Sequence, residues 1–127
     1  MFRYDLFDTG DTPSMEYYPG KDGETFAVGE ALTLAAGALT KCAAAATPTH
    51  ICVGPRMADD CVPATRVSRH IVYAAPLSAD GAALNLGDKV TLGDDGLTLT
   101  ATTASGVAEI VKVYGTAVGE DLAVRFA

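Results

Sequence analysis

An internal repeat constrains the fold of this chain more than any other feature of its sequence. Residues 28–53 align with residues 86–111 without a gap, at a constant offset of 58 positions, and eight of the 26 aligned pairs are identical. Six of the identical pairs are not explained by abundant alanine: Gly29/Gly87, Thr33/Thr91, Leu34/Leu92, Leu39/Leu97, Thr40/Thr98 and Val53/Val111. After a slip of one residue, residues 64–67 align with residues 123–126. We therefore expect a duplicated β unit, with pseudo-repeats at 28–67 and 86–126.

Each copy of the repeat predicts a β-hairpin. Residues 31–34 alternate Leu and Thr as a half-buried strand does, and residues 35–38 form a turn. The Ala-rich stretch 36–46 could also form a helix on propensity alone. The second copy argues against a helix, because Gly-Asp-Asp-Gly at 93–96 occupies the same place and the β-prone, Thr-rich segment 97–103 follows it. If the copies share a fold, both are hairpins.

The remaining β-like segments complete an all-β domain. Further strands are expected at 50–53, 64–75, 107–114 and 122–126, with residues 76–85 linking the two halves. Eight to ten short strands separated by regular turns are typical of a small β-barrel or sandwich. We expect a single β domain over residues 28–127, built from the two tandem units.

Residues 1–27 predict an extended N-terminal arm. This segment is broken by Gly and Pro and keeps no helical or alternating period. It is nevertheless rich in large apolar side chains, which are poorly hydrated unless they dock somewhere. They either pack on their own domain or bind a partner, where aromatic anchors dominate. The candidate anchors are Phe2, Tyr4, Phe7, Met15, Tyr17 and Tyr18.

Charge and composition exclude several classes of partner. The net charge of −7 argues against nucleic acid, because phosphate binding needs clustered Lys and Arg. No apolar run approaches the roughly 20 residues that cross a bilayer, and the N-terminus has no signal-peptide core, so we expect no membrane partner and synthesis in the cytoplasm. Only 7% of the residues are aromatic and none is Trp, which favours thin β layers over a cofactor pocket.

Two motifs near the N-terminus resemble catalytic signatures. Asp8-Thr9-Gly10 is the aspartic-protease triplet, and a retroviral-type protease pairs two such Asp residues in a dimer. The triplet begins too early to leave room for the strands that precede it in that family. The stretch from Asp5 to Thr9 resembles the nucleophile motif of haloacid-dehalogenase-like enzymes, but the chain lacks the βα alternation of that fold. A turn is the simpler interpretation of both.

The potential metal ligands do not have the spacing of a metal site. A metal site could be formed from the two histidines, two of the three cysteines and an acidic pair: His50, His70, Cys52, Cys61, Asp59 and Asp60. No pair among them has the separation typical of zinc or of a two-His-carboxylate centre, and the odd cysteine count without CxxC implies no disulfide framework. We therefore expect no catalytic, cofactor-binding or metal-binding residues, and no enzyme activity.

The whole chain resembles the small β-rich capsid decoration, or cement, proteins of tailed phages and prophages. The stretches that carry the resemblance are EYYPG, GEALTLAAGALTKC, PTHICVG, VPATRV with IVYAAPL, GDKVTLGDDGLTLTATTASGVAEIVKVYG and VGEDLAVRF. It is a similarity of layout rather than of invariant motifs, so no functional residue is carried over.

The resemblance implies a non-enzymatic virion protein on the outer surface of the phage head. Such a protein binds the assembled lattice, often as a homotrimer at local three-fold positions, and bridges neighbouring subunits of the major capsid protein. Alternatives are another virion subunit, such as a head fibre base or tail component, and a carbohydrate- or protein-binding β module. Exposed aromatic residues on the folded domain, rather than on an arm, would favour the carbohydrate-binding module.

Overall fold

The computed structural model describes residues 1–7 and 14–126, and this part of the chain is all-β, as expected. Five strands cover the first half of the chain: β1 (Arg3–Phe7), β2 (Met15–Pro19), β3 (Ala31–Ala35), β4 (Ala38–Lys41) and β5 (His50–Cys52). Five more follow: β6 (Cys61–Arg66), β7 (Ile71–Pro76), β8 (Lys89–Val90), β9 (Ala108–Val113) and β10 (Asp121–Phe126). The strands form two five-stranded antiparallel sheets that pack together like a sandwich and do not close into a barrel.

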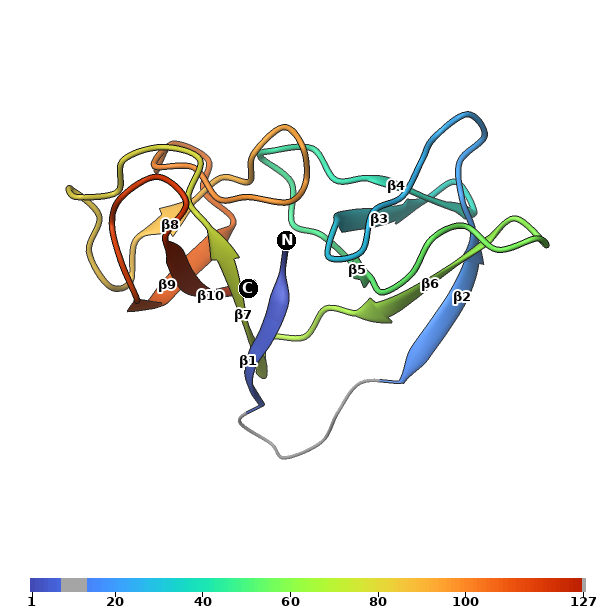
Figure 1. Ribbon diagram of the computed structural model, residues 1–127, viewed down its shortest axis with the longest axis horizontal. Coiled ribbons are helices and arrows are strands. Elements are labelled where there is room, and N and C mark those ends of the chain that lie inside the picture. Colours follow the sequence, from blue (N-terminus) through green and yellow to red (C-terminus); the bar gives the residue numbers. More distant parts are fainter. Residues whose placement is uncertain (8–13, 127) are drawn as a thin grey trace.

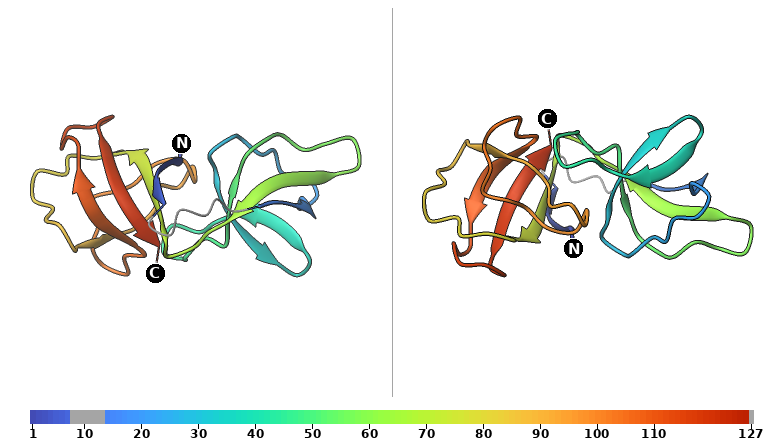
Figure 2. Two further views of the ribbon diagram at one scale, coloured as in Figure 1. Left: turned by 90° about the horizontal axis from the view of Figure 1, so that it is seen from below. Right: turned by 90° about the horizontal axis from the view of Figure 1, so that it is seen from above.

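Each sheet contains one copy of the repeat. One has the strand order β2-β6-β5-β3-β4, and we call it the first unit. The other has the order β1-β7-β10-β9-β8; strands β7 to β10 are the second unit, and β1 is added at its edge. Figures 1 and 2 show the two units side by side, with both chain termini between them.

The glycine that opens each copy forms the same turn. Gly29 N–H donates to the carbonyl of Cys52 at 2.7 Å, and 58 positions later Gly87 N–H donates to Ile110 at 2.8 Å. Both glycines have a φ in the left-handed region, 83° and 89°, which a residue with a Cβ rarely adopts. The repeat in the sequence therefore corresponds to a repeat in the backbone.

The hairpin of the first unit has the expected two-residue turn, and that of the second unit differs. Ala36 and Gly37 both have positive φ, as a type I′ turn requires, and β3 pairs with β4 around them. In the second unit, residues 97–103 were expected to form a strand, but only a single bridge joins Leu92 to Leu99. The Asp95 side chain accepts bonds from the residues after it, and such local bonds compete with strand pairing.

Two expected boundaries are wrong. The single strand predicted over 64–75 is divided into β6 and β7 by the loop 67–70, in which the Ser68 carbonyl accepts the Ile71 N–H. This loop joins the two units, whereas residues 76–85, expected to link them, belong to the second unit. A run of β-prone residues does not reveal where a strand changes sheet.

The one-residue slip in the repeat is also wrong. Ala64 pairs with Cys52 in the first unit, and Val124 pairs with Ile110 in the second. Since Cys52 and Ile110 are equivalent, Ala64 corresponds to Val124 and not to Ala123. The slip is two residues, because a slip of one would turn every side chain of the strand to the opposite face.

The extended arm expected over residues 1–27 is not confirmed. β1 pairs with β7 and β2 pairs with β6, so this segment supplies an edge strand to each sheet. Phe2 is only 3% exposed and its ring centroid lies 5.7 Å from that of Phe126. Burial of aromatic surface, the expected alternative in which these side chains pack on their own domain, explains why the segment joins the sheets.

Strand β1 also connects the two units. Phe2, directly before the strand, donates its N–H to Gly29 at 2.9 Å, and the Tyr4 hydroxyl donates to Thr65 Oγ1 at 2.7 Å, both in the first unit. Towards the second unit, Arg3 forms an ion pair with Asp121. The first strand of the chain is therefore held by both halves.

Two apolar clusters form the core. The larger one fills the second unit and includes Phe2 together with Ala31 and Ile51 of the first unit, so the sheets share it. The smaller one lies within the first unit, around Leu32 and Leu39. Among the described residues no helix is long and apolar enough to span a membrane.

Candidate functional site

The six candidate anchor residues lie in, or directly before, two strands of different sheets, β1 and β2. Phe2 is part of the shared core. Tyr18 is half-buried within the first unit, with its ring centroid 5.4 Å from that of His50. Phe7 lies in β1 opposite Ile71. Phe2 and Tyr18 therefore pack in different apolar clusters and do not form one binding surface.

The other three, Tyr4, Met15 and Tyr17, are exposed on β1 and β2, and we call them together the aromatic surface. They are 43%, 50% and 54% exposed. The Tyr4 hydroxyl reaches Thr65, which pairs directly with Met15 across β2 and β6, and the Tyr17 hydroxyl donates to the Met15 sulfur at 3.0 Å. Residues from two strands in different sheets thus meet beside Thr65, and large apolar groups exposed in this way are typical of binding surfaces.

A small cleft opens beside the aromatic surface. It has a volume of about 240 Å³ and lies between β1 and the first unit, and its lining includes Phe2, Tyr4, Ile51, Thr65 and Tyr73. Among the described residues, the buried Tyr73 hydroxyl has no hydrogen-bond partner, and burial raises its pKa. Such a volume suits one large side chain or a fragment-sized ligand rather than a cofactor.

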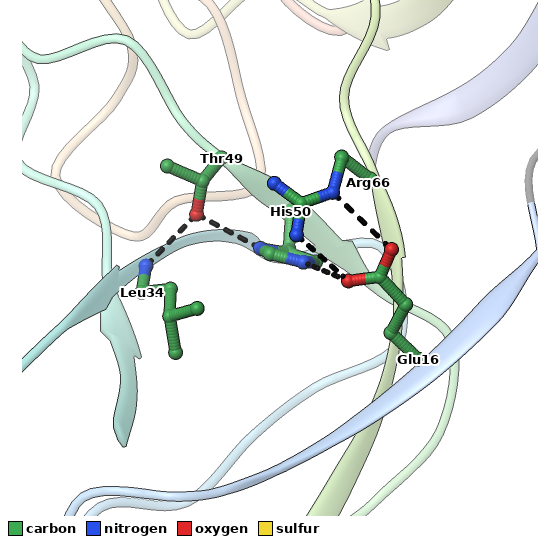
Figure 3. A network of polar contacts seen from close by, with 5 residues as sticks. All are labelled: Glu16, Leu34, Thr49, His50 and Arg66. Carbon is green, nitrogen blue, oxygen red and sulfur yellow. Dashed lines mark hydrogen bonds and ion pairs between the residues drawn. The ribbon is translucent and has the colours of Figure 1, made fainter. Parts of the chain in front are cut away.

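A polar network fixes β2 to its sheet from the opposite face (Figure 3). The buried His50 donates from Nε2 to Glu16 Oε1 at 3.0 Å, and Arg66 donates to the same carboxylate from Nε at 3.2 Å and from Nη2 at 3.1 Å. The His50 and Arg66 bonds lower the pKa of Glu16 to about 2. The carboxylate is therefore ionised at neutral pH.

The second ring nitrogen of His50 is also satisfied within the protein. Nδ1 lies 2.9 Å from Thr49 Oγ1, which itself accepts the Leu34 N–H at 2.8 Å. With its hydrogen on Nε2, the neutral ring accepts a hydrogen bond from the Thr49 hydroxyl at Nδ1. His50 is fully buried, whereas Glu16 at the end of this Thr-His-Glu series is partly exposed. The effect of the series is to order β2, β5 and β6.

The network was not found from the sequence. From the sequence, His50 is either a metal ligand or a histidine at the start of a strand, and neither interpretation names Glu16 or Arg66 as its partner. The available signals were a histidine within the apolar run His-Ile-Cys-Val and one acidic residue between Met15 and Tyr17. Neither signal names the partner, because the pairing depends on which strands become neighbours.

The potential metal ligands remain apart in the described residues. No group of three or more His, Cys, Asp or Glu side chains there could hold a metal ion. His50 and Cys52 are buried, while Asp59, Asp60 and His70 are exposed in loops. Burial raises the pKa of the Cys42 and Cys52 thiols, which disfavours their thiolate forms.

The motifs at the N-terminus are only partly described. The Asp8-Thr9-Gly10 triplet lies outside the described residues. Asp5 lies in β1 at the edge of an antiparallel sheet, where its carboxylate accepts the Tyr114 hydroxyl at 2.8 Å. A haloacid-dehalogenase-like nucleophile instead follows a buried parallel strand.

Comparison with known proteins finds no matching family model and no matching curated relative. The function must therefore be argued from the geometry and from the resemblance in sequence layout.

Proposed function

We propose that the protein is a non-enzymatic capsid decoration protein of a tailed phage, which binds the outside of the assembled head and bridges subunits of the major capsid protein. The observation that carries this proposal is the aromatic surface of Tyr4, Met15 and Tyr17 on a framework of paired strands. The side chains project from strands and not from loops, so little conformational entropy is lost when they bind. The resemblance in sequence layout supplies the identity of the partner.

Many weak contacts on a lattice can produce stable attachment. One exposed surface with three apolar side chains is small compared with a standard interface. A head presents many equivalent sites, and a homotrimer of the protein would engage three of them at once. Attachment through many equivalent contacts does not require a deep pocket or a reactive group.

The test is to mix the purified protein with expanded, undecorated heads assembled from the major capsid protein. We expect the heads to be occupied and to resist heating better, and we expect the double variant Tyr4→Ser, Tyr17→Ser to lose most of the occupancy. The matched control is Val118→Ser, which changes a residue 65% exposed elsewhere in the second unit and should bind as the wild type does. Absence of wild-type binding would refute the proposal.

A carbohydrate-binding module is the second candidate, and one observation favours it. Tyr4 and Tyr17 are exposed on the folded domain itself, and tyrosine rings present apolar faces on which sugar rings can stack. Titration of the labelled protein with oligosaccharides, followed by NMR, distinguishes the candidates. Shifts confined to these two residues would favour the module, and head binding without such shifts would favour decoration.

A further inference from the structure

The edge of β7 shows how this fold receives an added strand. β1 runs antiparallel to β7, with Arg3 opposite Ala74 and Phe7 opposite Ile71. Residues 71–74 are thereby covered on the side away from β10. In this arrangement the exposed fractions of Val72 and Ala74 are only 3% and 5%.

The first unit has the same edge in β2. Gly20 N–H donates to Asp60 at 3.0 Å at the end of β2, as Leu77 N–H donates to Glu120 at 2.8 Å at the end of β7. A parallel bridge follows in each unit, from Gly20 to Leu39 and from Leu77 to Leu99. These equivalences place residues 14–17 where the second unit has residues 71–74.

The edge of β2 has free hydrogen-bonding groups at two residues. Tyr17 pairs with Pro63, which has no N–H and whose carbonyl accepts Val53 N–H from the side of β5. In an antiparallel ladder, opposed residues that do not bond each other direct their N–H and C=O groups away from the shared side. Tyr17, and Met15 two positions before it, therefore direct these groups away from β6, and among the described strands β2 pairs only with β6.

Exposure and anchoring make this edge suitable for binding. Met15 and Tyr17 are about half exposed, whereas their counterparts Val72 and Ala74 are buried beside β1. Glu16, between them, is held from the inner face by His50 and Arg66, so the strand is already ordered before a partner arrives. Two features that protect natural edge strands occur in β2, an inward-pointing charge at Glu16 and a proline at Pro19, but Glu16 is already bonded to His50 and Arg66, and Pro19 lies at the far end of the strand from residues 14–17.

We propose that the edge of β2 at residues 14–17 binds an extended segment of another protein, which pairs antiparallel with it as β1 pairs with β7. This inference rests on the proposed function and makes the segment part of the major capsid protein. The partner strand should alternate apolar and polar residues, so that its apolar side chains pack beside Met15 and Tyr17.

The occupied edge also indicates the charge of the segment. Arg3, at the start of β1, pairs with Asp121 of β10. The position equivalent to Asp121 is Cys61, directly after the acidic pair Asp59 and Asp60. A basic residue near the amino end of the incoming strand would lie close to this pair.

The first test changes the edge without changing the sheet. Tyr17→Pro removes one outward N–H and no bond to β6, and Tyr17→Val is the matched control that loses the aromatic ring but keeps the N–H. We expect the Pro variant to bind undecorated heads about fivefold to tenfold more weakly than the Val variant, as befits one lost hydrogen bond. Equal binding by the two folded variants would overturn strand addition while leaving head binding intact. Tyr17→Lys replaces the Pro variant if the latter does not fold.

The second test needs no heads. The probe is a peptide with the sequence of residues 1–7 and two added lysines for solubility, and the readout is amide hydrogen exchange in the full chain. We expect the Met15 and Tyr17 amides to exchange fast in the free protein and to slow by at least about tenfold with saturating peptide, while the Val72 and Ala74 amides stay protected throughout. Fast exchange at both edge amides despite peptide would overturn the proposal. So would a concentration-dependent dimer that Tyr17→Pro abolishes, because a second copy would then be the occupant.

Discussion

Three equivalent positions are filled by opposite chemistry in the two units. In the first unit, Glu16, His50 and Arg66 form a polar network across β2, β5 and β6. In the second unit, the corresponding positions on β7, β9 and β10 are Tyr73, Ala108 and Phe126. The two rings lie with centroids 5.7 Å apart, and the small Ala108 takes the place of His50.

The comparison shows that backbone pairing, and not the chemistry of the interior, is what the two units share. The glycine turns and strand registers recur, while the contacts between the side chains do not. In the second unit, the ring of Phe126 also packs on Phe2, which directly precedes the added strand β1. In the first unit, Glu16, His50 and Arg66 bond one another within one sheet. Among the described strands, β2 has no neighbour on its outer edge.

Truncation of a buried ring in the second unit should have the largest effect on stability. Phe126→Ala is expected to lower the free energy of unfolding by about 3–5 kcal/mol, because it removes a buried ring at the contact with Phe2 and Tyr73. Chemical denaturation followed by circular dichroism measures the change. Val118→Ala is the exposed control, and its effect should stay within about 0.5 kcal/mol.

Removal of the central polar residue should have a smaller effect. His50→Ala is expected to destabilise the protein by about 1–3 kcal/mol, because Glu16 loses one donor but keeps Arg66. His70→Ala, which changes the exposed histidine, should be nearly silent in the same denaturation experiment. If His50→Ala lowered the free energy of unfolding more than Phe126→Ala does, the polar network would stabilise the protein more than the ring contacts of the second unit, contrary to this prediction.

The smallest effect concerns acid. The pKa of Glu16 is lowered from 4.5 to about 2 in the folded protein, so its ionised form adds stability above pH 4.5 that is lost as the pH falls towards 2. Glu16→Gln should therefore flatten the dependence of unfolding free energy on pH in this window by up to about one bound proton. The measurement is a series of denaturation curves from pH 5 to pH 2. If the unfolding free energies of the variant and the wild type depended on pH with the same slope, the lowered pKa of Glu16 would be contradicted.

The sequence predicted the parts of the fold that depend on local pattern. The Ala36-Gly37 turn and the glycine turns could be read because a positive φ restricts the choice of residue. The strand that ends at Phe126 could be read because its side chains alternate. These features are encoded within a few neighbouring residues.

The sequence did not predict the features that depend on distant partners. Residues 1–27 looked irregular because β1 and β2 belong to different sheets and each is only five residues long. The Glu16–His50 pair joins positions that only the sheet order brings together. The sequence assigns Tyr4, Met15 and Tyr17 to an arm, whereas the structure places them on strands β1 and β2.

The position of β1 has a consequence for synthesis on the ribosome. Strand β1 is translated well before its partner β7, and Phe2 packs on Phe126, which follows it later still in the chain. The first unit can assemble early, as amino-terminal units generally do, while β1 must wait in solution beside it. Strand β1 can therefore dock only after β7 and Phe126 have been made, and its docking joins the two halves.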